Sequence, residues 1–309
     1  MGEARTAGVS ARGRPDMASD MSITVGLPFW NNERTLGAAI QSVLAQTVAD
    51  WRLLLVNDGS RDASTAIARS FRDPRVRLVD DGEHRGLVYR LNQIARIATT
   101  PYLARMDADD LMHPKRLEVQ LRCLARSAPV DLVATAAYII DQNGRLAAVA
   151  GAEPLDTTPR HVLVHGLFLH PTVAGRTEWF RENPYDEFYV RAEDHELWVR
   201  TCRQSRFAKI PEPLYFYRET RPPDLRKCAE SHRTGRKIFR RYGPGIVGAA
   251  ETWRLICSSW LRDWGLKAAR ALHGQWLIAP FRSSRHLYLT PSPEQRREAE
   301  SILEVLAGS

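Results

Sequence analysis

The segment YLARMDADD, residues 102–110, decides the fold. Tyr102 to Met106 is a short, mostly apolar run of the kind that forms a strand buried on both faces, and three carboxylates follow directly at its carboxyl end. In open α/β sheets, ligands bind at the carboxyl ends of the strands. The segment therefore predicts a central strand that carries a polar site at its end.

Three similar units precede this strand. Apolar runs at residues 23–27, 52–56 and 76–79 predict further strands, and stretches with helical spacing near residues 36–44, 62–71 and 87–98 separate them. Pro114 suits the first turn of the helix that follows. This alternation predicts the parallel, right-handed half of an α/β protein, with a Rossmann-like sheet.

The pattern changes after residue 127. Residues 132–140 and 146–149 flank Asn143-Gly144 and predict a hairpin, which makes the sheet mixed. Residues 167–173 and 207–217 read as further strands, with a helix near residues 193–202 between them. Pro222-Pro223 marks a boundary near residue 220. The predicted organisation is a disordered tail (1–20), one catalytic domain of two halves (21–127 and 128–220) and a helical C-terminal region (221–309).

Composition excludes several classes. The 309 residues contain no apolar run of roughly 18 residues, so an integral membrane protein is not expected, and residues 1–20 lack the apolar centre of a signal peptide. The four cysteines are too few and too scattered for a disulfide framework, which favours a reducing cytoplasm. The net charge of +8 comes from 39 arginines and five lysines, a ratio more typical of a GC-rich genome than of nucleic-acid binding.

Polar residues follow three of the predicted strands, in the segments 28–33, 57–60 and 107–110. These segments are expected to converge on one rim of the sheet. The first turn is not G-x-G-x-x-G, and the chain has no G-x-x-x-x-G-K-[ST], so neither a dinucleotide-dependent dehydrogenase nor a P-loop enzyme is supported. Phosphate groups of a ligand must therefore be bound by something other than a glycine-rich loop.

Asp107 and Asp109 stand two residues apart, which in extended backbone directs both carboxylates to one side, where they can share a hard divalent ion. The alternative is that Asp109 and Asp110 only cap the helix near Pro114. The position after an apolar strand, with Asp58 on the neighbouring rim, favours the metal.

A second acidic pair, Glu193-Asp194, stands at a predicted helix start, where a carboxylate is either a cap or a general base. His170 precedes it in an apolar segment, where a histidine is more often a satisfied core residue than a ligand.

Taken in order, these segments resemble the family 2 glycosyltransferases of the GT-A fold across roughly residues 22–218. The resemblance is carried by residues 28–33 (PFWNNE), 41–47 (QSVLAQT), 57–60 (NDGS), 106–110 (MDADD), 113–118 (HPKRLE) and 193–198 (EDHELW). It implies a nucleotide-sugar donor, usually a UDP-sugar, in the first half and an acceptor in the second, with roles in glycan, polysaccharide or glycolipid assembly.

The resemblance also implies residue roles. Asp58 would meet the base, and Asp194, with Glu193 beside it, would be the catalytic base of an inverting enzyme. Asp109 and Asp107 would ligate Mn²⁺ or Mg²⁺, and His170 and Trp198 would face a saccharide or lipid-linked acceptor. The remaining donor-binding residues would be Pro28, Phe29, Trp30, Asn31, Glu33, Arg85, Asp107 and Ala108.

The chain departs from the family pattern at Asn57, where Asp is common, and at His84, where Asn is common. No Q-x-x-R-W follows the Glu193-Asp194 pair, so one sugar per encounter is expected. The alternatives are a sugar-phosphate nucleotidyltransferase, which needs a glycine-rich, lysine-bearing first loop, and a non-catalytic scaffold, which the intact acidic segments disfavour. A D-x-D phosphatase is not supported either, because residues 107–111 lack the following Thr or Ser and the nearby lysine that such an enzyme uses.

The C-terminal region carries two further patterns. The predicted helix between Asp224 and Tyr242 is basic, which suits either an anionic membrane, a phosphate-bearing acceptor or a plain solvated face. Its basic residues are Arg226, Lys227, Arg233, Arg236, Lys237, Arg240 and Arg241. Trp253, Ile256, Trp260 and Trp264 then recur at helical spacing, which favours core or homodimer packing over membrane contact. The expected location is cytoplasmic, with peripheral membrane contact as an option.

Overall fold

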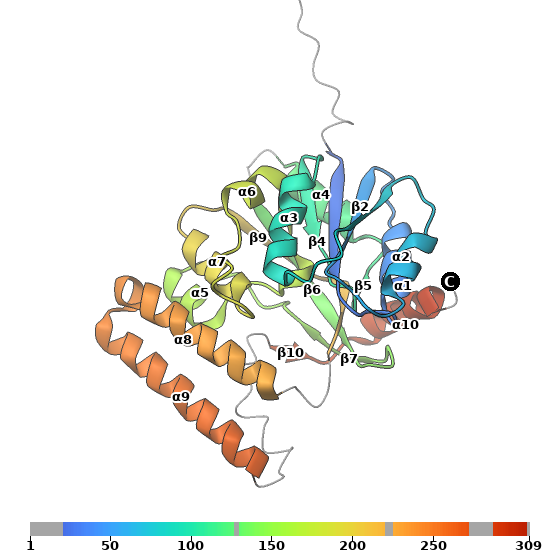
Figure 1. The fold of residues 1–309 in the computed structure, drawn as a ribbon. Helices are drawn as coiled ribbons and strands as arrows, with labels where there is room; N and C mark the ends of the chain where they lie inside the picture. Colours follow the sequence, from blue (N-terminus) through green and yellow to red (C-terminus); the bar gives the residue numbers. More distant parts are fainter. Residues whose placement is uncertain (1–20, 127–129, 220–224, 272–286, 308–309) are drawn as a thin grey trace, which may run out of the picture.

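The computed structural model describes residues 21–126, 130–219, 225–271 and 287–307. Within these ranges a single 10-stranded sheet runs in the order β10-β7-β6-β8-β4-β1-β2-β3, with β9 beside β6 and β5 beside β9. Helices cover both faces of the sheet, and a pair of long helices lies at one flank (Figure 1). The mixed α/β class predicted from the sequence is confirmed.

The first half is parallel, as predicted. The strands β1 (Ile23–Phe29), β2 (Trp51–Asn57), β3 (Val76–Asp80) and β4 (Tyr102–Arg105) pair in the spatial order β3-β2-β1-β4. Phe29 lies opposite Asn57, and Asn57 lies opposite Asp80. Three strands therefore end at the same level, which brings the loops after them together at one rim.

Helices clamp this half from two sides. The helices α1 (Leu36–Leu44), α2 (Ser64–Ser70) and α4 (Arg116–Leu124) bury apolar residues with one face of the sheet, and α3 (Leu87–Ile97) packs on the other. Gly26 of β1 faces α3 so closely that a Cβ there would lie 2.4 Å from the Ile94 side chain. Glycine at this position therefore sets the distance between α3 and the sheet.

The second half is mixed, also as predicted. The hairpin of β6 (Leu132–Ile140) and β7 (Leu146–Ala150) turns at Gly144, whose φ of 78° suits glycine. The long strand β9 (Phe207–Arg218) runs parallel to β6 and pairs with β5 (Leu111–Met112). The short strand β8 (Ala174–Arg176) joins the two halves, since it pairs antiparallel with both β4 and β6.

The predicted strand at residues 167–173 is wrong. The helix α5 (Pro159–His165) precedes this segment, a 3₁₀ turn (His170–Thr172) occupies its end, and α6 (Thr177–Glu182) follows β8. Pro171 has no amide to give to a strand ladder, and Phe168 packs edge-on against Trp198 and Phe207. The apolar run is a core segment without strand geometry.

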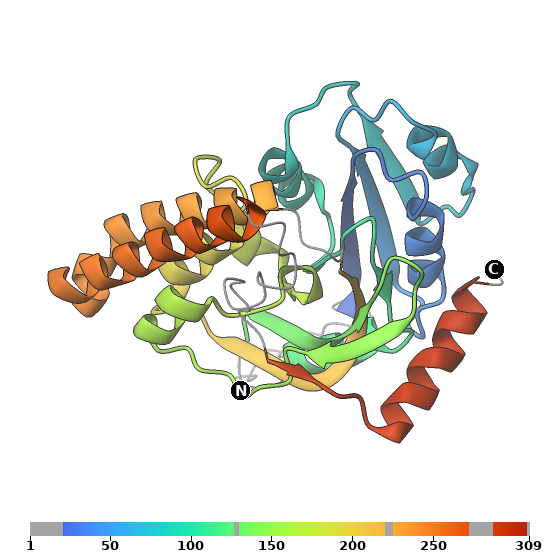
Figure 2. The ribbon, with the colours of Figure 1, turned by 90° about the horizontal axis from the view of Figure 1, so that it is seen from below.

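The C-terminal helices α8 (Leu225–Val247) and α9 (Ala249–Ala271) form an antiparallel pair. Figure 1 shows α8 between α9 and the body, beside α5 and α7 (Glu193–Thr201), and Figure 2 shows the pair projecting outward. His232 and Arg236 of α8 bind Asp263 of α9, at 2.6 and 2.7 Å. Arg236 is therefore buried between the helices, not part of a solvated basic face.

After α9 the chain returns to the sheet. The strand β10 (Tyr288–Leu289) pairs with β7, and α10 (Pro293–Ala307) places Glu298 3.3 Å from both His113 and Tyr138. The predicted tail at residues 1–20, Pro222-Pro223 and Asp224 lie outside the described residues. The division of the chain near residue 220 stays a prediction.

The prediction that the α9 tryptophans pack in the core is also wrong; homodimer packing stays a prediction. Ile256 is buried, but Trp253, Trp260 and Trp264 are 65%, 46% and 71% exposed. The face of α9 that meets α8 carries Ser259 and Asp263, and Trp260 lies at the edge of this contact, with its ring over the Arg236 guanidinium. In the described part of the chain, none of the helices combines the length and apolar character needed to cross a membrane.

Candidate active site

The polar segments at the strand ends line two adjoining hollows. One, of about 350 Å³, is bordered by Trp30, Asp58, His84, Asp107 and Asp109, among others. The other, of about 580 Å³, is bordered by residues 31–35, Arg61, Asp62 and Asp109. Asn32 and Asp109 belong to both. The predicted rim therefore exists and is hollowed.

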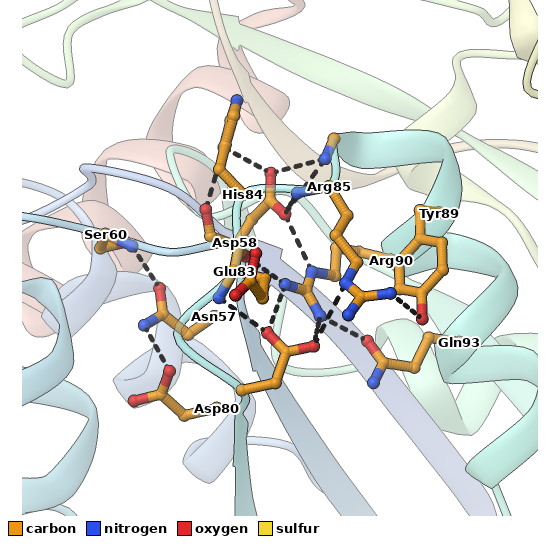
Figure 3. Close-up of polar contacts among 12 residues, drawn as sticks. Asn57, Asp58, Ser60, Asp80, Glu83, His84, Arg85, Tyr89, Arg90 and Gln93 are labelled. Carbon is orange, nitrogen blue, oxygen red and sulfur yellow. Dashed lines mark hydrogen bonds and ion pairs between the residues drawn. The ribbon is translucent and has the colours of Figure 1, made fainter.

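Asp58 is the centre of a hydrogen-bond network at this rim (Figure 3). One carboxylate oxygen accepts the amides of Arg85 at 2.8 Å and Gly86 at 3.1 Å and the Arg90 Nε at 2.9 Å. His84 Nδ1 lies 3.0 Å from the other oxygen. These contacts support a role for Asp58 in holding the loop 82–86; its predicted contact with the base stays a prediction.

Arg90, which the sequence analysis missed, completes the network. Its side chain is fully buried and bridges Asp58 to Asp81, with a second pair of bonds at 2.7 and 2.8 Å. These bonds lower the pKa of Asp81 to about 2. The available signal was an arginine inside the apolar helical stretch 87–98, which requires acidic partners if buried.

We expect Arg90→Met to lower the free energy of unfolding by about 3 to 5 kcal/mol, because Asp58 would keep a buried charge without its guanidinium partner. Chemical denaturation measures this change. Arg96→Met on the same helix is the matched control, since Arg96 is exposed. Equal losses in the two variants would show that the buried bridge contributes nothing particular.

Trp30 and His84 form one wall of the smaller hollow. Their ring centroids lie 4.6 Å apart, and Trp30 is 51% exposed. Asn31, with φ of 53°, ties this segment to the next strand end, because its amide donates to Ser60 and its side chain accepts the Arg61 amide. The exposed indole face offers a stacking surface for a planar ligand.

The other predicted donor residues differ in what they offer. Pro28, Phe29 and Ala108 border the smaller hollow, and Glu33 borders the larger one while accepting the Ala63 amide. The Arg85 guanidinium instead turns to the Tyr89 hydroxyl at 3.1 Å. Arg85 therefore serves this site through its amide.

Asp107, Asp109 and Asp110 form an acidic cluster, with carboxylate oxygens within 4.8 Å of one another. Arg105 binds Asp107 at 2.8 Å. Asp110, which the sequence analysis assigned only to a cap, is buried and accepts the Arg218 amide at 2.6 Å, while its other oxygen has no hydrogen-bond partner among the described residues. An all-oxygen, all-carboxylate set fits a hard divalent ion.

The cluster is electrostatically strained without a cation. Loss of hydration and repulsion by Asp107 raise the pKa of Asp109 to about 6, and burial raises that of Asp110 well above its usual value. A divalent ion would relieve this repulsion, so the residues present fit the implied Mn²⁺ or Mg²⁺.

The second acidic pair begins α7. Glu193 is buried, and burial followed by repulsion from Asp194 raises its pKa to about 7. His170 lies behind it, with Nδ1 3.6 Å from Glu193 and Nε2 hydrogen-bonded to the Tyr185 hydroxyl at 2.8 Å. Burial keeps the pKa of His170 well below its usual value, so this imidazole is neutral. Asp194 is half-buried and the more accessible carboxylate of the pair.

Arg105 connects the two acidic groups. It is 5% exposed, binds Asp107, and its charge acts on Glu193 and His170 as well. Its Nε and Nη1 have no hydrogen-bond partner among the described residues. Arg105 lies within the predicted strand at residues 102–106, and its position in the sequence indicated no role in the site.

The predicted acceptor contacts need correction. Trp198 is 1% exposed and packs with Phe168, Trp179 and Phe207, so its ring belongs to the core and does not reach an acceptor. His170 is buried as well, with its Nδ1 3.6 Å from Glu193, so it too does not reach an acceptor.

Comparisons with known proteins agree with this geometry. A sequence profile of "Glycosyl transferase family 2" matches residues 24–183. The putative glycosyltransferase EpsE of Bacillus subtilis is 32% identical over 66% of this chain and 75% of its own length. The Escherichia coli UDP-Glc:alpha-D-GlcNAc-diphosphoundecaprenol beta-1,3-glucosyltransferase WfgD is 27% identical over 62% of this chain and 74% of its own.

A solved structure carries the same fold. The mannosyltransferase PcManGT from Pyrobaculum calidifontis, in complex with GDP-Man and Mn²⁺, aligns with a TM-score of 0.56 and 17% identity over 93% of this chain and 75% of its own. The chain is thus a glycosyltransferase with a GT-A fold. It belongs to glycosyl transferase family 2.

Proposed function

We propose that the protein transfers one sugar per encounter from a nucleotide-sugar, of the UDP class, to an acceptor hydroxyl, with a divalent metal and with inversion at the sugar carbon. One observation carries this proposal: Arg105 binds Asp107 of the acidic cluster at 2.8 Å, and its charge also acts on Glu193 of the second acidic pair. Metal-dependent inverting transfer needs a cation that stabilises the negative charge of the leaving diphosphate, and a base that takes the proton of the acceptor hydroxyl.

Asp109 and Asp107 are the proposed metal ligands. A bound Mn²⁺ or Mg²⁺ would neutralise the charge that develops on the leaving diphosphate. Arg105 orients Asp107, while Trp30, His84 and the loop held by Asp58 form the nucleoside side. The name of WfgD, which specifies UDP-Glc, supports the UDP class.

Asp194 is the proposed base. It takes the proton of the acceptor hydroxyl as the new C–O bond forms and the bond from the sugar to the diphosphate breaks, so one displacement inverts the carbon. Glu193, whose pKa is about 7, is partly protonated at neutral pH, which keeps the local negative charge low.

Release of nucleoside diphosphate from a panel of nucleotide-sugars, with and without Mn²⁺, tests the function. We expect turnover with a UDP-sugar and metal, and none in excess chelator. Preference for a GDP-sugar would replace the donor class. Absence of donor hydrolysis and transfer under every condition would favour the non-catalytic alternative, and formation of a nucleotide-sugar from a sugar phosphate would favour the nucleotidyltransferase.

We expect kcat/KM to be maintained as the pH falls through 7. The proton that the acidic pair binds in this range goes to Glu193, whose pKa is raised to about 7, and not to the proposed base Asp194. Glu193→Gln resembles the protonated pair, so its pH–rate profile near pH 7 should match that of the wild type. A wild-type loss of activity centred near pH 7, together with an inactive Glu193→Gln, would contradict the assignment of Asp194 as the base.

A further inference from the structure

The outer side of α9 carries an exposed aromatic stripe. Trp253, Trp260 and Trp264 recur at positions i, i+7 and i+11, with Leu261 72% exposed beside them. At 1.5 Å per residue, the three indoles span roughly 16 Å of the helix. The face of α9 that carries Ser259 and Asp263 binds α8, and Trp260 is the member of the stripe that also contacts α8, through Arg236. The exposed indoles of Trp253 and Trp264 extend the stripe beyond that contact.

Basic residues of α8 lie next to this stripe. The Trp260 ring stacks over the Arg236 guanidinium, 4.0 Å from the ring centroid, and Arg233 and Arg240 are exposed one turn before and after Arg236. Lys237, the next residue, lies over the Phe188 ring at 4.1 Å. The rings of Phe188 and Trp260, 62% and 46% exposed, therefore flank a single basic turn of α8.

Phe188 links this surface to the active site. It is 62% exposed and belongs to the loop that leads directly into Glu193-Asp194, as does Val190, which is 61% exposed. The hydroxyl of Thr234 in α8 holds that loop through the Val190 carbonyl at 2.9 Å. The surface formed by the α9 tryptophans and by Arg233, Lys237 and Arg240 thus extends to the loop before the proposed base.

We propose that this surface, the aromatic-basic face, docks the enzyme on an anionic lipid bilayer. Indoles prefer the bilayer interface, where an apolar ring and a polar N–H are both satisfied, and arginine and lysine beside them are attracted to anionic headgroups. Docking would bring the loop of Phe188 and Val190 to the lipid surface. If the proposed function holds, the acceptor hydroxyl then arrives on a lipid-linked saccharide.

Charge favours a bilayer over a second copy of the chain. Two copies of a face that carries Arg233, Lys237 and Arg240 repel each other, whereas anionic headgroups complement it. Two of the nearby acids are paired, since Glu230 lies 3.9 Å from Arg191 and Glu251 pairs with Arg254, whereas Glu187 beside Phe188 is exposed. Asp186 accepts the Phe188 amide.

Vesicle flotation with the full chain tests the proposal. We expect binding to phosphatidylcholine vesicles that contain phosphatidylglycerol to exceed binding to phosphatidylcholine alone by about tenfold, and to weaken with salt. Trp253→Ser with Trp264→Ser, and separately Arg233→Glu with Arg240→Glu, should each reduce binding by about tenfold or more.

Matched controls lie outside the aromatic-basic face. Arg72→Glu with Arg77→Glu makes the same charge change at exposed positions just after α2 and in β3, and Leu287→Ser removes another exposed apolar side chain. Figure 1 shows α2 at the flank away from α9. These variants should bind vesicles like the wild type. Equal binding to neutral and anionic vesicles, or equal loss in the controls, would overturn the proposal.

Sedimentation without lipid tests the alternative that a second copy of the chain covers this face. A wild-type dimer that dissociates on Trp253→Ser with Trp264→Ser would assign the face to a second copy and overturn bilayer docking. Circular dichroism checks that the variants fold. Vesicle binding requires no turnover, so a failure of docking and a failure of the proposed glycosyl transfer are observed independently.

Discussion

Asp109→Asn should lower kcat by roughly 10³-fold or more, because a metal ion at the leaving diphosphate is worth several kcal/mol of transition-state stabilisation. Asp109 borders both hollows, and it stands beside Asp107 in the acidic cluster. The hydrogen bond from Arg218 goes to its main-chain oxygen, which the substitution leaves in place. The loss should therefore come from metal binding, with little change in stability.

Titration with Mn²⁺ measures the metal affinity, and thermal unfolding of the same samples measures the stability. Asp50→Asn is a suitable control, since Asp50 is a half-exposed carboxylate at the other end of β2. We expect the control to keep both metal affinity and turnover. Normal turnover of Asp109→Asn, or full wild-type activity in excess chelator, would exclude the metal from the reaction.

The parallel half of the fold was predictable because its sequence is locally consistent. Each apolar run was followed by a stripe with helical spacing, and the strands at residues 23–29 and 51–57 formed where the pattern indicated. The segment 167–173 was not, since a short apolar run has no period that separates strand from core loop. There Pro171 and the packing of Phe168 decided the structure.

The carboxylates of the site were predictable, but the arginines that organise them were not. Asp58, Asp107 and Asp109 follow strands, and position alone marks them. Arg90 and Arg105 gain their meaning from burial beside carboxylates on other segments, and the chain's many arginines offered no contrast. Periodicity likewise grouped the α9 tryptophans on one face but could not tell which face meets α8.

The two halves of the proposed mechanism meet at Arg105. Its bond to Asp107 orients a proposed metal ligand, and its positive charge opposes the rise in the pKa of Glu193 that burial and Asp194 cause. The proposed metal site and the proposed base therefore share one electrostatic environment. A substitution in the pair at residues 193–194 must be interpreted by its charge as well as by its shape.

Asp194→Asn should lower kcat by roughly 10² to 10⁴-fold while donor affinity changes little, because the amide keeps the side-chain shape but cannot accept the acceptor's proton. Asparagine also caps a helix start nearly as well as aspartate, so α7 should stay intact. Turnover at saturating acceptor and the affinity for UDP with Mn²⁺ measure the two effects separately.

Glu193→Gln decides which carboxylate of the pair is the base. Glu193 is buried and partly protonated near neutral pH, and glutamine resembles its protonated form, so this variant should retain most of its turnover at pH 7. A large loss of turnover in Glu193→Gln, with near-normal transfer by Asp194→Asn, would identify Glu193 as the base in place of Asp194. Near-normal transfer by both variants would leave the pair as the start of α7 and remove the acid–base step from this site.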